Sequence, residues 1–152
     1  MKKIILSTVM STLAVSTFLA SPAFAKTWQV QMLNKDPDNA TTRMLFKPNF
    51  LKIAPGDTVE FKATNKGHNS MAIKGMIPQG AKAWKGPMNK DFTVTLTKPG
   101  LYGYKCMPHF ALGMVGLIQV GDDTSNLDAA KKAKLIGKSK SVFAKLFAKV
   151  KA

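Results

Sequence analysis

The chain has 152 residues, with 23 Lys and Arg against eight Asp and Glu, a net charge of +15, one Cys and two His. This length suits one domain with a buried core behind a short leader, so neither disulfides nor a metal need be the sole source of stability. A single Cys excludes an internal disulfide.

Residues 1–25 have the pattern of a secretory signal peptide. A basic start at Lys2 and Lys3 is followed by an apolar run over 4–19, and Ala23-Phe24-Ala25 predicts cleavage before Lys26. The run is shorter than the roughly 20 residues that cross a bilayer, so a removed leader is favoured over a membrane anchor. We therefore expect residues 26–152 to form one exported domain, with a bacterial periplasm as its compartment.

The exported part keeps a strong positive charge. It has 21 Lys and Arg against eight acids, a net charge of +13. This charge predicts an acidic partner. Nucleic acid is disfavoured because the chain is exported and because Arg43 is its only Arg, whereas base and phosphate recognition relies on the guanidinium group. An acidic face on another protein is the favoured partner.

Short alternating segments separated by turn residues predict an antiparallel all-β sandwich. Pro55-Gly56 and Pro99-Gly100 mark two of the turns. Residues 34–42 are polar and predict a loop, and 76–90 predict a long connection with one helical turn. The expected strands are residues 27–33, 50–53, 58–63, 92–96, 101–104 and 115–120.

The C-terminal segment, from about 124 to 152, changes to helical periodicity. Ser125 is a candidate N-cap for a helix through Lys134, and Gly137 separates it from a second helix. In the second helix an apolar stripe lies on one side and lysines lie on the other. This pattern is found in helices that pack on a sheet and in helices that lie on membranes. Packing against the sheet is favoured. The stripe is Val142, Phe143, Leu146, Phe147 and Val150.

The segment from Cys106 to Met114 carries the chemical information. It holds Cys106, His109 and Met114 in one loop between two expected strands, and His68 follows an upstream strand. Two imidazoles and a thiolate with a weak thioether form the ligand set of copper that cycles between Cu(I) and Cu(II). The segment therefore predicts a copper site.

Three other interpretations of Cys106 compete with copper. Zinc sites use four firm ligands, and a Met is a poor fourth ligand. A catalytic Cys–His pair is conceivable, but His109 is only three residues away, and no orienting Asp or Asn or oxyanion element is evident. A buried, inert thiol does not account for the two His. With no open coordination position, the predicted metal passes one electron and the protein is not an enzyme.

Several segments resemble the pseudoazurins, small blue-copper proteins of the cupredoxin family. The resemblance covers nearly the whole exported chain and includes the two C-terminal helices. Three details depart from the family pattern: Met107 stands where Thr is frequent, Phe110 where Tyr is common, and the loop 36–43 is longer. The matching segments are Met32–Lys35, Pro55–Val59, Lys66–Asn69, Met76–Pro78, Cys106–Met114, Val120–Asp122 and Asn126–Asp128.

The resemblance implies an eight-stranded Greek-key sandwich with one type 1 copper ion per monomer. His68, Cys106 and His109 would be equatorial ligands and Met114 the axial ligand. Asn69 would join the two ligand loops, donate its backbone N–H to the Cys106 sulfur and, with Pro108, lie beside the ligands. His109 would reach solvent within an apolar docking patch. The implied docking residues are Met44, Gly67, Pro108 and Leu112, ringed by Lys35, Lys66, Lys85 and Lys105.

The implied function is outer-sphere electron transfer to a periplasmic denitrification enzyme, chiefly copper nitrite reductase, with a haem nitrite reductase as another acceptor. We expect a monomer that neither binds nucleic acid nor inserts into membranes. Two other functions remain open from the sequence. A periplasmic copper storage or delivery protein would use the same ligand types, and a cationic membrane-binding module would need no copper.

Overall fold

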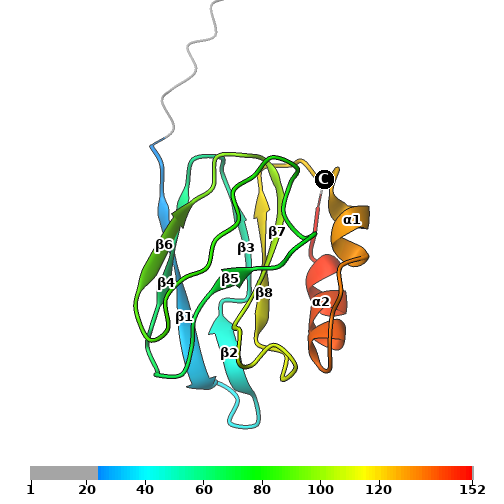
Figure 1. The fold of residues 1–152 in the computed structure, drawn as a ribbon. Helices are drawn as coiled ribbons and strands as arrows, with labels where there is room; N and C mark the ends of the chain where they lie inside the picture. Colours follow the sequence, from blue (N-terminus) through cyan, green and yellow to red (C-terminus); the bar gives the residue numbers. More distant parts are fainter. Residues whose placement is uncertain (1–23, 152) are drawn as a thin grey trace, which may run out of the picture.

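The computed structural model describes residues 24–151 as eight strands followed by two helices (Figure 1). The predicted leader falls almost wholly within residues 1–23, which lie outside the described residues. Between residues 24 and 151, no helix is long and apolar enough to cross a membrane. The elements are β1 (Thr27–Lys35), β2 (Arg43–Lys47), β3 (Phe50–Ile53), β4 (Thr58–Lys62), β5 (Met71–Ala72), β6 (Phe92–Thr95), β7 (Gly100–Lys105), β8 (Val115–Val120), α1 (Leu127–Lys131) and α2 (Ser139–Phe147).

The strands form two four-stranded sheets. The first has the order β2-β1-β4-β6 and the second the order β3-β8-β7-β5. The pairs β1–β4 and β3–β8 are parallel, and the other neighbours are antiparallel. Parallel neighbours far apart in sequence require connections that cross between the sheets. The predicted Greek-key sandwich with two C-terminal helices is confirmed.

Alternating residues fill the space between the sheets. Val30 and Met32 of β1 and Val59 and Phe61 of β4 are fully buried, while their neighbours along each strand are more exposed. This period of two is the reason that these segments form strands with one face toward a core.

The strand β8 is buried along its whole length, which explains why its sequence is apolar except for the buried Gln119. One face looks into the sandwich, and α2 packs over the other (Figure 1). Phe143 and Leu146 of α2 are buried in this second layer. The prediction that the apolar stripe packs against the sheet is confirmed.

Several element predictions were incomplete. β2 and the two-residue β5 were not among the expected strands, and the first helix, expected to run through Lys134, ends at Lys131. Met44 in β2 has a positive φ of 52°, which is rare for a residue with a side chain and breaks the expected alternation. Residues 76–90 contain turns and one isolated bridge rather than a helical turn.

The N-cap of α1 is Asn126 rather than Ser125. The Asn126 side chain makes no cap hydrogen bond and bonds the backbone of β7 instead. Its Oδ1 accepts from the Leu101 N–H at 2.9 Å, and its Nδ2 donates to the Leu101 carbonyl at 2.9 Å. The short helix is therefore held to the sheet by a side chain that sequence rules assign to capping.

A buried carboxylate fixes the start of the sandwich. Asp57 is only 5% exposed and accepts hydrogen bonds from the backbone N of Lys26, the indole N of Trp28 and the backbone N of Ala54. Burial acts to raise the pKa of Asp57. The three hydrogen bonds and the Lys26 charge outweigh it, so the pKa lies below its ordinary value.

Tyr104 and Gly116 form a cross-strand pair between β7 and β8. A Cβ at Gly116 would overlap the Tyr104 ring, so the absence of a side chain at Gly116 provides the space that the ring occupies. The Tyr104 hydroxyl is buried without a hydrogen-bond partner among the described residues, and its burial raises the Tyr104 pKa.

Candidate metal centre

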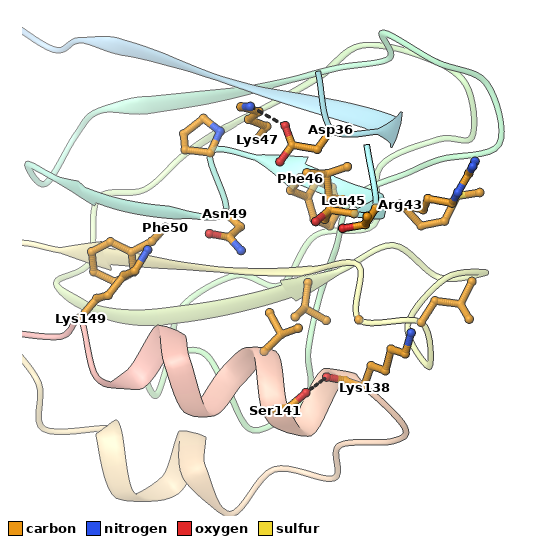
Figure 2. A pocket seen from close by; sticks show the side chains of 18 residues that line it. Asp36, Arg43, Leu45, Phe46, Lys47, Asn49, Phe50, Lys138, Ser141 and Lys149 are labelled. Atoms are coloured by element: carbon orange, nitrogen blue, oxygen red, sulfur yellow. Dashed lines mark hydrogen bonds and ion pairs between the residues drawn. The ribbon is translucent and has the colours of Figure 1, made fainter. Parts of the chain in front are cut away.

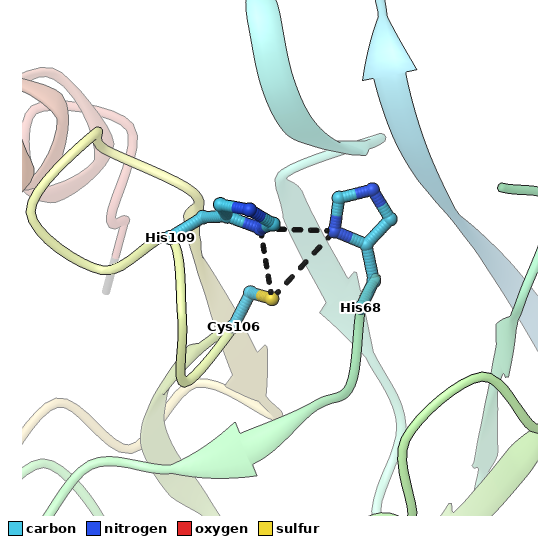
Figure 3. A group of neighbouring side chains, drawn as sticks. All are labelled: His68, Cys106 and His109. Atoms are coloured by element: carbon cyan, nitrogen blue, oxygen red, sulfur yellow. Dashed lines mark hydrogen bonds between the residues drawn. The ribbon is translucent and has the colours of Figure 1, made fainter. Parts of the chain in front are cut away.

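Three donor side chains meet at one end of the sandwich. His68 comes from the segment between β4 and β5, Cys106 directly follows β7, and His109 lies in the loop before β8. Cys106 Sγ is 3.7 Å from His68 Nδ1 and 3.5 Å from His109 Nδ1, and the two Nδ1 atoms are 3.2 Å apart (Figure 3). The structure thus forms one triangle from residues that are up to 41 positions apart.

The loop that follows Cys106 is closed by its own backbone. The Cys106 N–H donates to the Met114 carbonyl at 3.0 Å, and the Met114 N–H donates to the His109 carbonyl at 3.2 Å. Gly113 has a φ of 90°, a conformation that favours glycine. This turn brings Met114 back beside Cys106, and the Met114 side chain is fully buried.

His68 is held in one orientation by an asparagine. Its Nε2 lies 2.7 Å from Asn34 Oδ1 at the end of β1. Because an amide oxygen only accepts, Nε2 carries the proton and Nδ1 presents its lone pair to the triangle. Burial, and then the nearby His109, lower the pKa of His68. The ring is therefore kept neutral, the state that binds metals.

Asn69 joins the two segments that carry the donors. Its Oδ1 accepts from the Met107 N–H at 2.9 Å, and its Nδ2 donates to the Gly86 carbonyl at 3.2 Å. Burial raises the pKa of the Cys106 thiol, while backbone hydrogen bonds from Asn69 and His109 act in the opposite direction. The same two hydrogen bonds favour the thiolate form of Cys106, and a bound cation would favour that form further.

Two asparagines that support the triangle were missed by sequence reasoning. One is Asn34, described above. The other is Asn89, whose Oδ1 accepts from the Gly67 N–H at 2.5 Å and whose N–H donates to the His68 carbonyl at 2.9 Å. Neither lies near a ligand in sequence, and neither belongs to a spacing motif. The only signal for Asn34 was its position at the end of an expected strand.

The exposed edge of the site lies at His109, which is half-buried while His68 and Cys106 are buried. A side chain at Gly67 would begin 3.9 Å from the His109 ring, so Gly67 borders that edge. Leu112 is 53% exposed, Pro108 is exposed, and Met44 is half-buried. An apolar, partly exposed rim therefore flanks this part of the ligand loop.

Two of these rim residues, Met44 and Leu112, also line a groove of about 630 Å³. It runs between β2 with its following turn on one side and α2 on the other (Figure 2). Figure 2 places Arg43 on the strand side and Lys138 and Lys149 on the helix side. The rim is thus continuous with a positively charged groove.

The four lysines expected around the rim have different environments. Lys35, Lys66 and Lys85 are exposed, and Lys105 is half-buried. The Lys105 Nζ lies 4.5 Å from the centre of the Phe110 ring, so it contacts the ligand loop directly. Among the described residues, no hydrogen bond, ion pair or ring contact links Lys85 to the triangle.

The chemistry of the donors fits copper. Separations of 3.2–3.7 Å suit three donors around one ion at bond lengths of about 2.0 Å to nitrogen and 2.3 Å to sulfur, as found for zinc. Two imidazoles, a thiolate and a neighbouring buried Met are the softer set that copper prefers. The fold and the site together define a copper protein of the cupredoxin class.

Comparisons with known proteins agree. Residues 31–121 match the profile of copper-binding proteins of the plastocyanin/azurin family. The pseudoazurin of Paracoccus pantotrophus is 51% identical over 122 residues, which are 80% of this chain and 82% of that protein. A solved Sinorhizobium pseudoazurin is 47% identical with a TM-score of 0.78, over 84% of this chain and 98% of that one. The Methylobacterium extorquens AM1 pseudoazurin is 39% identical with a TM-score of 0.77, over 82% and 99%.

The chain therefore belongs to the pseudoazurins, within the plastocyanin/azurin family of copper-binding proteins. Its cofactor is a type 1 copper ion, and its activity is cupredoxin-type electron transfer with redox partners.

Proposed function

We propose that this protein is a periplasmic carrier that delivers one electron at a time to a denitrification enzyme, with copper nitrite reductase as the acceptor. His68, Cys106 and His109 would hold the copper in one plane, with Met114 as the weak axial ligand. The mature protein would begin at Lys26 and act as a monomer. The observation that carries this proposal is the buried sulfur–nitrogen triangle with a single ring edge, that of His109, near solvent.

Copper bound here would accept and release one electron between Cu(I) and Cu(II). The protein would keep the donors in nearly the same positions in both states. His68 is fixed by Asn34 and Asn89, and Cys106 is fixed by its backbone bonds to the ligand loop. Burial of Cys106 keeps water from the sulfur. A fixed, dry site limits rearrangement during transfer and leaves no open position for a substrate.

These features support a carrier over a copper storage or delivery protein. A storage or delivery protein needs metal ligands that a copper-accepting protein can reach and displace. Here His68, Cys106 and Met114 are each 0% exposed, so an incoming ligand has access only from the His109 side. We expect a carrier of this kind to retain copper in both redox states when it is challenged with a chelator.

The acceptor would dock on the apolar rim around His109. Met44, Gly67 and Leu112 would exclude water from the contact, and the nearby lysines would attract an acidic face. Attraction between exposed charges is screened over about 8 Å at physiological ionic strength, so it acts on the rate of encounter and weakens with salt.

The test is stopped-flow transfer from the reduced protein to copper nitrite reductase across a series of salt concentrations. A Lys66→Gln/Lys105→Gln variant should lower the second-order rate several-fold at low salt and flatten its salt dependence. A Lys52→Gln/Lys98→Gln variant removes the same charge at the other end of the strands and should behave like the unmodified protein. Equal loss in both variants, or a rate independent of salt, would refute steering by the lysines at the rim.

A further inference from the structure

The positive charge of the protein is concentrated in its C-terminal helical segment. Residues 124–152 carry eight Lys and one acid, Asp128, a net charge of +7, whereas residues 26–123 carry +6. All eight lysines are exposed, and no acid follows Asp128. More than half of the net charge therefore lies in less than a quarter of the expected mature chain. The lysines are Lys131, Lys132, Lys134, Lys138, Lys140, Lys145, Lys149 and Lys151.

The same segment has a shallow hollow with an apolar floor. The hollow has a volume of about 480 Å³, and Lys131 and Lys140 are its only charged lining residues. Nearby Ile136, between the two helices, is 41% exposed. Phe143 in the floor of the hollow is fully buried, whereas Leu135 and Phe147 are half-buried. Cationic groups beside partly exposed apolar side chains form a surface suited to amphiphiles with anionic heads. The remaining lining residues are Leu135, Phe143, Ala144, Phe147 and Ala148.

This surface is distinct from the copper centre, although the residue before α2 contacts the ligand loop: the Lys138 N–H donates to the Ala111 carbonyl at 2.9 Å. The helices α1 and α2 lie along one side of the sandwich, beside the sheet that contains β8, whereas the ligand loop closes one end (Figure 1). Contacts made through the exposed side of the helices therefore leave the His109 edge free for a redox partner.

We propose that the helical face, defined as the exposed surface of Lys131, Lys132, Lys134, Lys140 and Lys145 together with the hollow that Lys131 and Lys140 line, binds the surface of an anionic phospholipid bilayer. The protein lies on the bilayer without inserting a helix. Each lysine held near such a surface adds about fivefold to affinity at moderate salt. The proposal goes beyond electron transfer and does not depend on the identity of the acceptor.

The composition of the helical face favours a bilayer over an acidic protein. Protein interfaces are depleted in Lys and enriched in Arg and aromatic residues, and they combine both signs of charge to fix one register. The helical face contains lysines only and has no Arg or acid within residues 129–151. A uniform array of flexible ammonium groups suits a fluid array of phosphates, which imposes no register.

The test measures sedimentation of the copper-loaded protein with vesicles of 30% phosphatidylglycerol in phosphatidylcholine, beside vesicles of phosphatidylcholine alone. The protein should sediment with the anionic vesicles at low salt and should be released at high salt. A Lys131→Gln/Lys134→Gln/Lys140→Gln/Lys145→Gln variant should bind at least about 25-fold more weakly, the equivalent of two lysine contacts. The control, Lys52→Gln/Lys74→Gln/Lys90→Gln/Lys98→Gln, removes the same charge elsewhere and should lose less than about fivefold.

A second pair of variants tests the hollow. Ala144→Glu places a negative charge in its lining, whereas Ala83→Glu places one at an exposed position outside the helices. Only Ala144→Glu should weaken vesicle binding markedly. Retention of the blue copper spectrum verifies that each variant is folded.

Several outcomes would overturn the proposal. Equal losses in the two quadruple variants would mean that net charge, rather than the helical face, causes binding. Absence of binding to anionic vesicles would exclude the bilayer directly. Unchanged vesicle binding together with slower electron transfer in the helical variant would assign the lysines to an acidic protein partner instead.

Discussion

Replacing Asn34 tests how the protein prepares its metal ligands. Asn34 Oδ1 is the acceptor for the proton on His68 Nε2, at 2.7 Å, and the His68 side chain is fully buried. Loss of the acceptor leaves a buried N–H unsatisfied, a cost of about 1–3 kcal/mol, and frees the ring to rotate or change tautomer. Partners of this kind affect metal affinity by about 10- to 100-fold, which corresponds to the same range of free energy.

The exposure of Asn34 decides where in that range each substitution falls. Asn34 is exposed, so in Asn34→Ala a water can approach His68 and replace part of the bond. We expect about a 10-fold loss of copper affinity for Asn34→Ala. In Asn34→Leu an apolar side chain of similar volume excludes that water, so the loss should approach 100-fold. Asn34→Asp keeps an acceptor and should remain close to the original protein.

The assay is competition for Cu(I) with a chromogenic chelator, read as the midpoint of copper transfer. Asn39→Ala serves as the control because Asn39 is exposed and bonds only within its own loop. If Asn34→Leu retained copper as well as Asn34→Ala and the original protein, the orientation of His68 would not depend on this hydrogen bond. We expect the copper affinity to be lowest in Asn34→Leu, higher in Asn34→Ala and highest in Asn34→Asp.

Four further expectations concern stability and can be measured by urea unfolding of the copper-loaded protein. Tyr104→Phe removes a buried hydroxyl without a partner and should stabilise the fold by about 1 kcal/mol, and a clear loss would reveal a missed partner. Gly116→Ala should destabilise by about 1–3 kcal/mol or more through overlap with Tyr104, whereas unchanged stability would show that the ring can move. The pKa of Asp57 is lowered in the folded protein. The stability that its carboxylate contributes is therefore fully present above its unfolded pKa of about 3.9 and is lost as the pH falls through the folded pKa. Asp57→Asn should therefore lower the free energy of unfolding at pH 7 and make it fall less steeply in acid than in the original protein. Parallel pH profiles of stability for the two proteins would refute this assignment. Phe143→Ala should cost about 3–5 kcal/mol by emptying the layer beneath α2, and a loss below 1 kcal/mol would show that α2 contributes little.

The fold class could be predicted because most strands bury one face and expose the other. The segments around Val59 and Phe61 alternate regularly, and β8 is apolar except for Gln119 because it is covered on both sides. β2 was missed because Met44 has a positive φ that breaks the alternation, and β5 because two residues have no measurable period. Local patterns therefore recover regular strands and fail where tertiary contacts alone maintain the pairing.

The candidate donors could be predicted because only one Cys and two His exist in the chain. Rarity and ligand chemistry identified His68, Cys106 and His109 without any knowledge of the fold. The residues that orient them were not accessible in the same way. Asn34 lies 34 positions before His68, and Asn89 lies 21 positions after it. Each reaches His68 through a hydrogen bond that no spacing rule encodes. Asparagine is also common in loops because its side chain bonds the neighbouring backbone, so its presence in a loop does not indicate a role at a metal site.

The charge distribution gives the two faces of the protein different physical properties. The rim around His109 combines exposed apolar groups with lysines, while the helical face carries lysines beside a hollow. Salt should therefore weaken partner encounter and vesicle binding together, but substitutions should separate them, since the two sets of lysines do not overlap.

The central claim is that Cys106 is a copper ligand, and the most direct measurement is the visible absorption and EPR spectrum of the Cu(II) protein beside Cys106→Ser. A thiolate–copper bond predicts an intense visible band and a narrow copper hyperfine splitting, and both should disappear in Cys106→Ser. A colourless protein, or an ordinary Cu(II) spectrum that the substitution leaves unchanged, would contradict the assignment of Cys106 as a ligand and the electron-carrier function with it.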